Sequence, residues 1–121
     1  MKQKLSFEFK DNILVVGLPS DYSLKSAAEQ TINFVENLNP TGKIGLLMDL
    51  TEAREAREVS LVRGAFKHWE PLREWVSQYA VLAESELHWG LTRQVAIFAE
   101  EEGFTIRPFK RKEDAMKWLA S

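Results

Sequence analysis

Residues 43–49 read KIGLLMD, and this stretch decides the interpretation of the whole chain. It is a short, continuous apolar run preceded by the turn residues Pro40, Thr41 and Gly42, and it is too short to be a helix of its own. Such a run is typical of a strand that is buried on both faces in a parallel sheet. Because parallel strands are joined by crossover helices, we expect the flanking segments to alternate between helices and strands.

The segments before this run predict a hairpin followed by a helix. Residues 5–9 alternate apolar and polar side chains and residues 13–18 are continuously apolar, with a polar turn at 10–12 between them. Residues 22–38 place apolar side chains at three- and four-residue steps, as on the buried stripe of a helix. Ser20 or Asp21 is expected to cap this helix.

The segments after the run predict more helices and strands. Residues 59–76 gather apolar side chains on one arc of a helix, which Pro71 should kink or divide. A strand is expected at 78–83, a helix from Ser85 to 103, an edge strand with Pro108 at 104–109, and a closing helix at 113–120. The order β-β-α-β-α-β-α-β-α predicts one α/β domain over residues 1–121, with a mixed, mostly parallel sheet of about five strands and about four helices.

Composition narrows the classes of function. The 121 residues carry a formal net charge of -2, which lacks the basic footprint of a nucleic-acid binder. The absence of cysteine excludes disulfides, thiol nucleophiles and cysteine-ligated metal sites. No apolar run approaches the roughly 20 residues that span a bilayer, and the N-terminus has no export pattern. We therefore expect a cytoplasmic protein without stable membrane insertion.

Polar residues follow the predicted strands at their carboxyl ends. In a parallel sheet these ends share one edge, where helix N-termini favour anions, so we expect a rim there that binds a ligand or a partner. Its residues are Ser20, Asp21, Tyr22, Asp49, Thr51, Glu84, Ser85 and His88. The alternative is that the hydroxyls only cap helices and the carboxylates only complement helix dipoles.

An enzyme or a metal site would draw on Asp49, Glu84 and His88 of this rim, as acid, base or ligand. The chain has only two histidines, no His-x-x-x-His or Glu-x-x-His pair, and no glycine-rich phosphate loop. We therefore expect no catalysis, no metal and no cofactor.

The predicted helix 59–76 offers a second, apolar candidate site. If this helix moves as a lid, a pocket for a small apolar or lipid-like molecule would open between it and the sheet. The lining residues would be Leu61, Phe66, Trp69 and Leu72, and if the helix stays in place they are core. Trp75 falls on the polar side of the same helix, where it either marks a contact surface or tucks under a loop, and Trp89 lies near the rim.

The whole pattern resembles the STAS domains of anti-sigma-factor antagonists and sulphate transporters, and most closely their SpoIIAA-like branch. The resemblance covers nearly the whole chain. It rests on the hairpin 7–18, the strand end 46–51, the helix with Phe66, the strand 79–83 with a Trp-containing helix start, and the ending 106–109 with 115–119. It implies a non-catalytic regulatory module that binds a protein partner, or a second copy of itself, through the rim and the helix with Phe66 and Trp69.

The resemblance also concerns phosphorylation and lipids. Regulatory STAS proteins carry a phosphorylatable serine in an Asp-Ser-Ser-Gly segment after the central strand. Here residues 49–51 resemble the lead-in, but residues 54–58 replace the segment itself, which leaves Thr51 and Ser60 as candidate phosphoacceptors. The SpoIIAA-like branch is similar to small lipid-transfer domains of the CRAL-TRIO type, which makes a carrier of an apolar ligand the alternative function.

Overall fold

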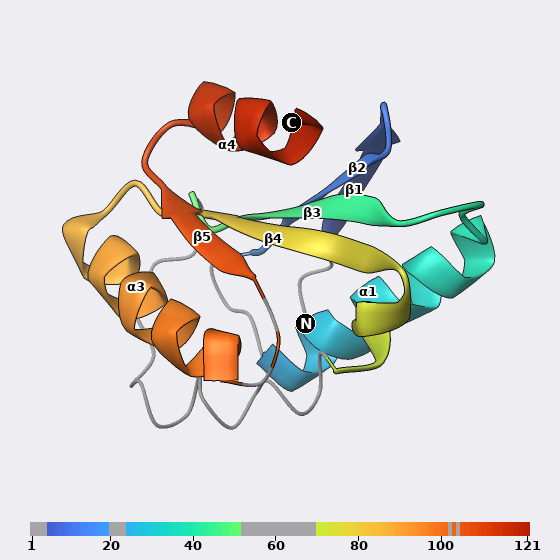
Figure 1. Ribbon diagram of the computed structural model, residues 1–121, viewed down its shortest axis with the longest axis horizontal. Coiled ribbons are helices and arrows are strands. Elements are labelled where there is room, and N and C mark those ends of the chain that lie inside the picture. Colours follow the sequence, from blue (N-terminus) through green and yellow to red (C-terminus); the bar gives the residue numbers. More distant parts are fainter. Residues whose placement is uncertain (1–4, 20–23, 52–69, 102, 104) are drawn as a thin grey trace.

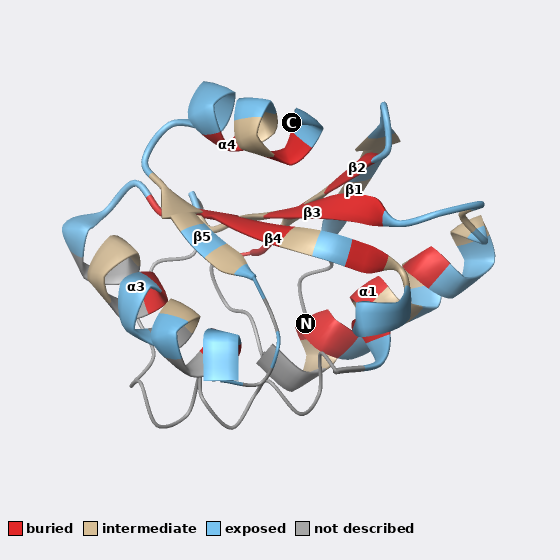
Figure 2. Cartoon of the chain, in the orientation of Figure 1, coloured by how far each residue is buried: buried red, intermediate tan, exposed pale blue. Residues whose placement is uncertain are grey.

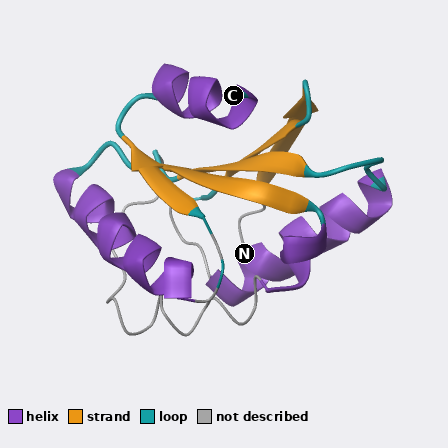
Figure 3. Ribbon diagram, viewed as in Figure 1, coloured by secondary structure: helices purple, strands orange, loops and turns teal. Residues whose placement is uncertain are grey.

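The computed structural model describes residues 5–19, 24–51, 70–101, 103 and 105–121 (Figure 1). Its elements are β1 (Ser6–Lys10), β2 (Ile13–Gly17), α1 (Leu24–Leu38), β3 (Ile44–Asp49), the 3-10 helix η1 (Glu70–Glu74), β4 (Val76–Leu82), α3 (Glu86–Glu101), β5 (Ile106–Phe109) and α4 (Lys112–Ala120). The strands form a five-stranded sheet in the order β1-β2-β3-β4-β5. β1 is antiparallel to β2, and β2 to β5 run parallel (Figure 3), which confirms the predicted α/β class.

The β1–β2 hairpin forms because its turn residues tolerate a left-handed backbone. Asp11 and Asn12 have φ angles of 53° and 62°. Two successive positive φ angles are typical of a type I′ turn, whose twist matches that of the strands it joins. Lys10 pairs with Ile13 directly across this turn. The predicted hairpin is confirmed.

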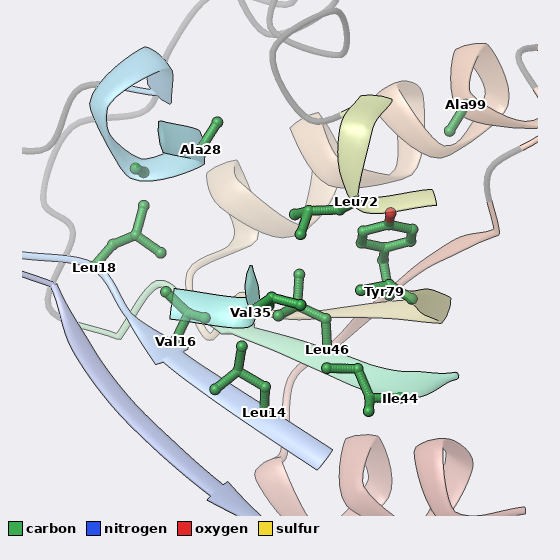
Figure 4. Close-up of a cluster of buried hydrophobic side chains, with 12 residues drawn as sticks. Leu14, Val16, Leu18, Ala28, Val35, Ile44, Leu46, Leu72, Tyr79 and Ala99 are labelled. Carbon is green, nitrogen blue, oxygen red and sulfur yellow. The ribbon is translucent and has the colours of Figure 1, made fainter. Parts of the chain in front are cut away.

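Helices cover both faces of the sheet, with α1 and α3 on one side and α4 on the other (Figure 1). Alternate residues of the same strand therefore enter two different cores, which is why β2, most of β3 and the second half of β4 are runs of apolar residues. The main cluster includes Leu14, Val16, Leu46 and Tyr79 from the strands with Ala27, Ala28 and Val35 from α1 (Figure 4). The second cluster joins Ile13, Leu47, Ala80 and Leu82 to Ala115 and Leu119 of α4. Figure 2 shows the buried residues concentrated where these layers meet.

Helix α1 accommodates one hydroxyl on its buried side. Thr31 is fully buried, and its hydroxyl donates a hydrogen bond of 2.7 Å to the Ala27 carbonyl one turn earlier, so the polar group has a partner. The helix ends at Asn39, which has a φ of 49° and donates its N–H to the Val35 carbonyl at 3.0 Å. This left-handed residue at the C-terminus confirms the predicted end of the helix.

The predicted helix 59–76 is wrong at its C-terminal end, and its first part lies outside the described residues. Residues Glu70–Glu74 form a 3-10 helix, and Val76 is already the first residue of β4. Pro71 has no N–H and its ring opposes the carbonyl four residues earlier, which disfavours an α-helix through this point. Trp75 is half-buried and packs against the main cluster. The α-helices of the described residues are thus α1, α3 and α4, where four helices were predicted.

Within the described residues, no helix combines the length and apolarity that a membrane-spanning segment needs.

Candidate functional site

The last residues of the four parallel strands form one row across the sheet. Gly17 is paired with Asp49, Asp49 with Leu82, and Leu82 with Phe109. Backbone hydrogen bonds continue one step beyond this row, from Leu18 to Asp49 at 3.0 Å, from Leu50 to Leu82 at 3.0 Å and from Ala83 to Phe109 at 2.8 Å. The segments that leave the strands therefore start at a common edge. We keep the term rim for the described polar residues at this edge, which are Asp49, Thr51, Glu84 and Ser85.

At the end of β3, the Asp49 side chain forms hydrogen bonds with the residue that follows the strand by two positions. Its Oδ1 accepts a hydrogen bond of 2.8 Å from the Thr51 backbone N–H and a second one from the Thr51 hydroxyl. An aspartate that binds the backbone two residues ahead replaces the lost sheet hydrogen bonds by a local turn. Asp49 is half-buried and Thr51 is exposed, so this turn presents both side chains at the surface.

At the end of β4, the chain passes directly into α3. Glu84, Ser85 and Glu86 are exposed, and the Ser85 carbonyl accepts the Trp89 N–H at 2.9 Å in the first turn of the helix. Glu86 is acidic in the first turn, where it complements the helix dipole. Its carboxylate also forms an ion pair with Lys110, the residue after β5. Glu84 precedes the helix and takes part in neither arrangement.

The remaining predicted site residues fall outside what can be described. Ser20, Asp21, Tyr22, Ser60, Leu61, Phe66 and Trp69 lie outside the described residues, and His88 belongs to α3 but its side chain is not described. The structure therefore brings together Asp49, Thr51, Glu84 and Ser85 of the predicted set. Leu72 is fully buried in the main cluster, which agrees with the core alternative for this residue.

Two observations on the part of the chain that the structure describes concern metal ligands and shifted ionisation. No three His, Asp or Glu side chains within it lie close enough to hold a metal ion. Tyr79 has a shifted ionisation, because burial raises the pKa of its phenol well above the usual 10, while the positive charge of Arg73 acts in the opposite direction. Tyr79 belongs to the main cluster and precedes the end of β4, so its phenol is a neutral core group.

The sequence did not predict a group of aromatic and cationic side chains that lies beside β5. The Trp89 ring lies 4.9 Å from the Arg93 guanidinium and 5.1 Å from the Lys110 ammonium. On the α4 side, the Arg107 guanidinium lies 5.5 Å from the Phe109 ring and 6.0 Å from the Trp118 ring. The signal that points to this group is the run of residues 107–112, which holds four cations and no acidic residue.

Comparison with known proteins defines the fold. The chain is similar to the crystal structure of an uncharacterised DUF3478-family protein with a SpoIIAA-like fold from Shewanella loihica PV-4, with a TM-score of 0.58, 18% identity and coverage of 96% of this chain and 92% of that chain. The chain has a SpoIIAA-like fold. A point variant of RsbS from Moorella thermoacetica is also similar, with a TM-score of 0.56, 14% identity and coverage of 97% and 95%. No protein family and no curated protein matches the sequence.

At these identities the likeness concerns the backbone. The resemblance to SpoIIAA-like STAS domains that the sequence predicted is therefore confirmed as a SpoIIAA-like fold, and RsbS is itself a STAS-domain protein. The role of the rim is a separate question.

Proposed function

We propose that this protein is a non-catalytic regulatory module that binds another protein through the rim. The observation that carries the proposal is the row of strand ends, which brings Asp49, Thr51, Glu84 and Ser85 to one edge. The fold supports it, because RsbS, a STAS-domain protein, shares this architecture. A fold hosts many functions, so the chemistry of the rim has to support the proposal as well.

The rim carries two carboxylates, those of Asp49 and Glu84. Among the described residues, neither Asp49 nor Glu84 forms an ion pair, whereas Glu86 nearby is paired with Lys110. Asp49 is fixed by its turn with Thr51, so its position is set before any partner arrives. Prepositioned, unpaired carboxylates at an exposed edge suit lysine and arginine side chains of a partner, which they would attract and orient.

Binding explains this arrangement better than catalysis does. A general base must reach a proton of a bound substrate in a site that excludes water. Asp49 instead accepts two hydrogen bonds from Thr51, and Glu84 lies exposed. An apolar ligand under the helix 59–76 is the alternative, and the burial of Leu72 in the main cluster weighs against it.

The test is affinity capture of the partner from an extract of the cells that make this protein. The immobilised baits are the wild-type protein and two double variants. Asp49→Asn with Glu84→Gln removes two rim carboxylates. Glu8→Gln with Glu36→Gln removes two exposed carboxylates from β1 and α1 and is the matched control. We expect a protein that binds the wild type and the control in equal amounts, and that binds the rim variant about tenfold more weakly once both proteins are pure.

Two results would overturn the proposal. One is a partner that both double variants lose equally, since binding would then depend on net charge. The other is a reaction catalysed by the wild type and abolished by Asp49→Ala or Glu84→Ala, which would make these carboxylates catalytic.

We also propose Thr51 as the phosphoacceptor of the rim, while Ser60 lies outside the described residues. Because the Thr51 hydroxyl donates to Asp49, a phosphate on it would lie beside a carboxylate and would repel it. Phosphorylation would therefore open the turn that holds Asp49 and weaken the rim. Intact mass of the protein isolated from its own cells tests this, and a phosphate that persists in Thr51→Val contradicts it.

A further inference from the structure

We infer that the edge of the molecule at β5 is a second binding surface, which takes an acidic segment of another protein. We call it the β5 surface, and it consists of Trp89, Arg93, Arg107, Phe109, Lys110 and Trp118. It lies beside the rim but uses different residues and the opposite charge. The inference does not rest on the function proposed for the rim.

Arg107 is held in place by aromatic rings and has unused donors. Phe109 and Trp118 are half-buried and tilted by 45° with their centroids 5.7 Å apart, and the exposed guanidinium of Arg107 lies against both. Within the described residues, Arg107 forms neither a hydrogen bond nor an ion pair. A guanidinium stacked on aromatic rings is already oriented, and its N–H groups match the two oxygens of a carboxylate.

Trp89 organises a second pair of cations on the α3 side. Arg93 and Lys110 both lie within about 6 Å of its ring, the range of a cation–π contact. Lys110 also pairs with Glu86, whereas Arg93 has no carboxylate partner among the described residues. Two cations around one indole repel each other, and a single glutamate offsets this only in part. An additional carboxylate at this position would therefore be favourable.

The β5 surface is positively charged, whereas the chain as a whole has a net negative charge. Arg93, Arg107 and Lys110 give this surface three cations, whereas the whole chain has a formal net charge of -2. A local cluster of positive charge attracts a short acidic segment, even though the chain as a whole has a net negative charge. A long polyanion such as a nucleic acid would in addition meet Glu86 and Glu113, which lie within the basic region. A protein segment whose carboxylates are spaced apart fits this combination of positive and negative side chains better than a nucleic acid does.

The segment is held by side chains and not by addition of a strand. β5 is the outermost strand of the sheet. The carbonyls of Thr105 and Phe109 accept hydrogen bonds from β4, so the backbone of Pro108 between them faces the free side. Proline has no N–H to donate, which interrupts the ladder that an added strand would need. The cations on either side of β5 are what remains for recognition.

The test uses a short synthetic peptide of aspartate, glutamate and glycine as probe, with binding followed by the NMR signals of backbone amides and of the Trp89 and Trp118 indoles. We expect saturable shifts at these indoles and at the backbone amides of residues 105–107 and 109–112. Arg107→Gln should weaken binding about tenfold, the contribution of one charge-assisted pair, and Arg107→Lys should weaken it about threefold because the charge stays but the fork is lost. Glu86→Gln should strengthen binding, since it releases Lys110 from its ion pair.

The matched control is Lys10→Gln, which removes an exposed cation from β1, the opposite edge of the sheet. It should leave binding unchanged, as should the rim double variant, so failure of the rim proposal and failure of this one remain distinguishable. Three results would overturn the inference. They are the absence of saturable shifts, an equal loss with Lys10→Gln, and a single-stranded oligonucleotide that binds the same residues as tightly as the peptide.

Discussion

Helix α4 approaches β3 so closely that a side chain at position 45 would be in tight contact with Leu119. A methyl group on Gly45 would lie 3.1 Å from Leu119 Cδ2 and 3.4 Å from Leu119 Cβ. Leu119 is 8% exposed and packs in the second cluster, so it cannot simply turn into solvent. We therefore examine Gly45→Ala in two backgrounds, with Leu119 present and with Leu119→Ala.

The expected effect changes sign between these backgrounds. Overpacking of a core costs about 1–3 kcal/mol, and replacement of a strand glycine by alanine gains about 0.5–1 kcal/mol. With Leu119 present, Gly45→Ala should therefore lower the free energy of unfolding by about 1 kcal/mol. Leu119→Ala alone should lower it by about 2 kcal/mol, at the low end for a buried leucine. In that background the Cδ2 contact is gone, and Gly45→Ala should raise the free energy of unfolding by about 0.5 kcal/mol.

Urea unfolding of the four proteins, followed by circular dichroism, measures this coupling. Gly42→Ala is the control, because a methyl group there meets no atom within 4 Å, and it should change the free energy of unfolding by less than about 0.5 kcal/mol. A Gly45→Ala effect that is the same in both backgrounds would refute the close packing of α4 on β3. The same packing positions Trp118 beside Arg107, so the β5 surface depends on it.

Substitutions at three further residues test the core and the rim. Leu72→Ala should lower the free energy of unfolding by about 2–5 kcal/mol, because Leu72 is fully buried. The exposed control Ile97→Ala should lower it by less than about 0.5 kcal/mol. A small effect of Leu72→Ala would instead favour a pocket-lining role for Leu72. Asp49→Ala should cost about 1 kcal/mol through its lost turn and Asp49→Asn clearly less, because the amide oxygen still accepts from Thr51; equal losses would contradict this. Burial raises the pKa of Tyr79, so the folded phenol keeps its proton where the unfolded one, with a pKa near 10, releases it. The free energy of unfolding should then fall above about pH 10, by up to about 1.4 kcal/mol per pH unit, and an equally steep fall in Tyr79→Phe would exclude this cause.

The fold was predictable because most of its signals are local. The hairpin turn at 10–12, the helix stripe of α1 and the apolar run of β3 each determine their own element. The error at 70–76 arose because helix and strand patterns overlap there. Leu72 and Val76 are four residues apart, as on one face of a helix, but Pro71 disfavours an α-helix there, residues 70–74 form a 3-10 helix, and Val76 pairs with Ile44 as part of β4.

The candidate sites were predictable to different degrees. The common edge of the rim followed from parallel strands alone, since their carboxyl ends meet wherever the strands pair. The β5 surface could not be predicted in the same way, because Trp89 and Lys110, or Arg107 and Trp118, come together only through the packing of α3 and α4 against β5. The sequence shows the basic run 107–112 but not the rings that orient it.

The distribution of charge over the two surfaces bears on the alternative to a binding rim, in which the carboxylates only complement helix dipoles. Arg107 lies in a strand and serves no helix terminus, whereas Glu84 lies two residues before α3, where a carboxylate also complements the helix dipole. The two surfaces meet where Ala83 is hydrogen-bonded to Phe109, and there Glu86 and Lys110 do pair. Beyond this corner, Asp49 and Glu84 of the rim and Arg93 and Arg107 of the β5 surface form no ion pair with any residue that the structure describes. Keeping like charges together costs self-repulsion that folding does not require, and attraction of oppositely charged partners offsets it. Both interactions should therefore weaken as ionic strength rises, while the stability of the two cores, which are apolar, should respond far less.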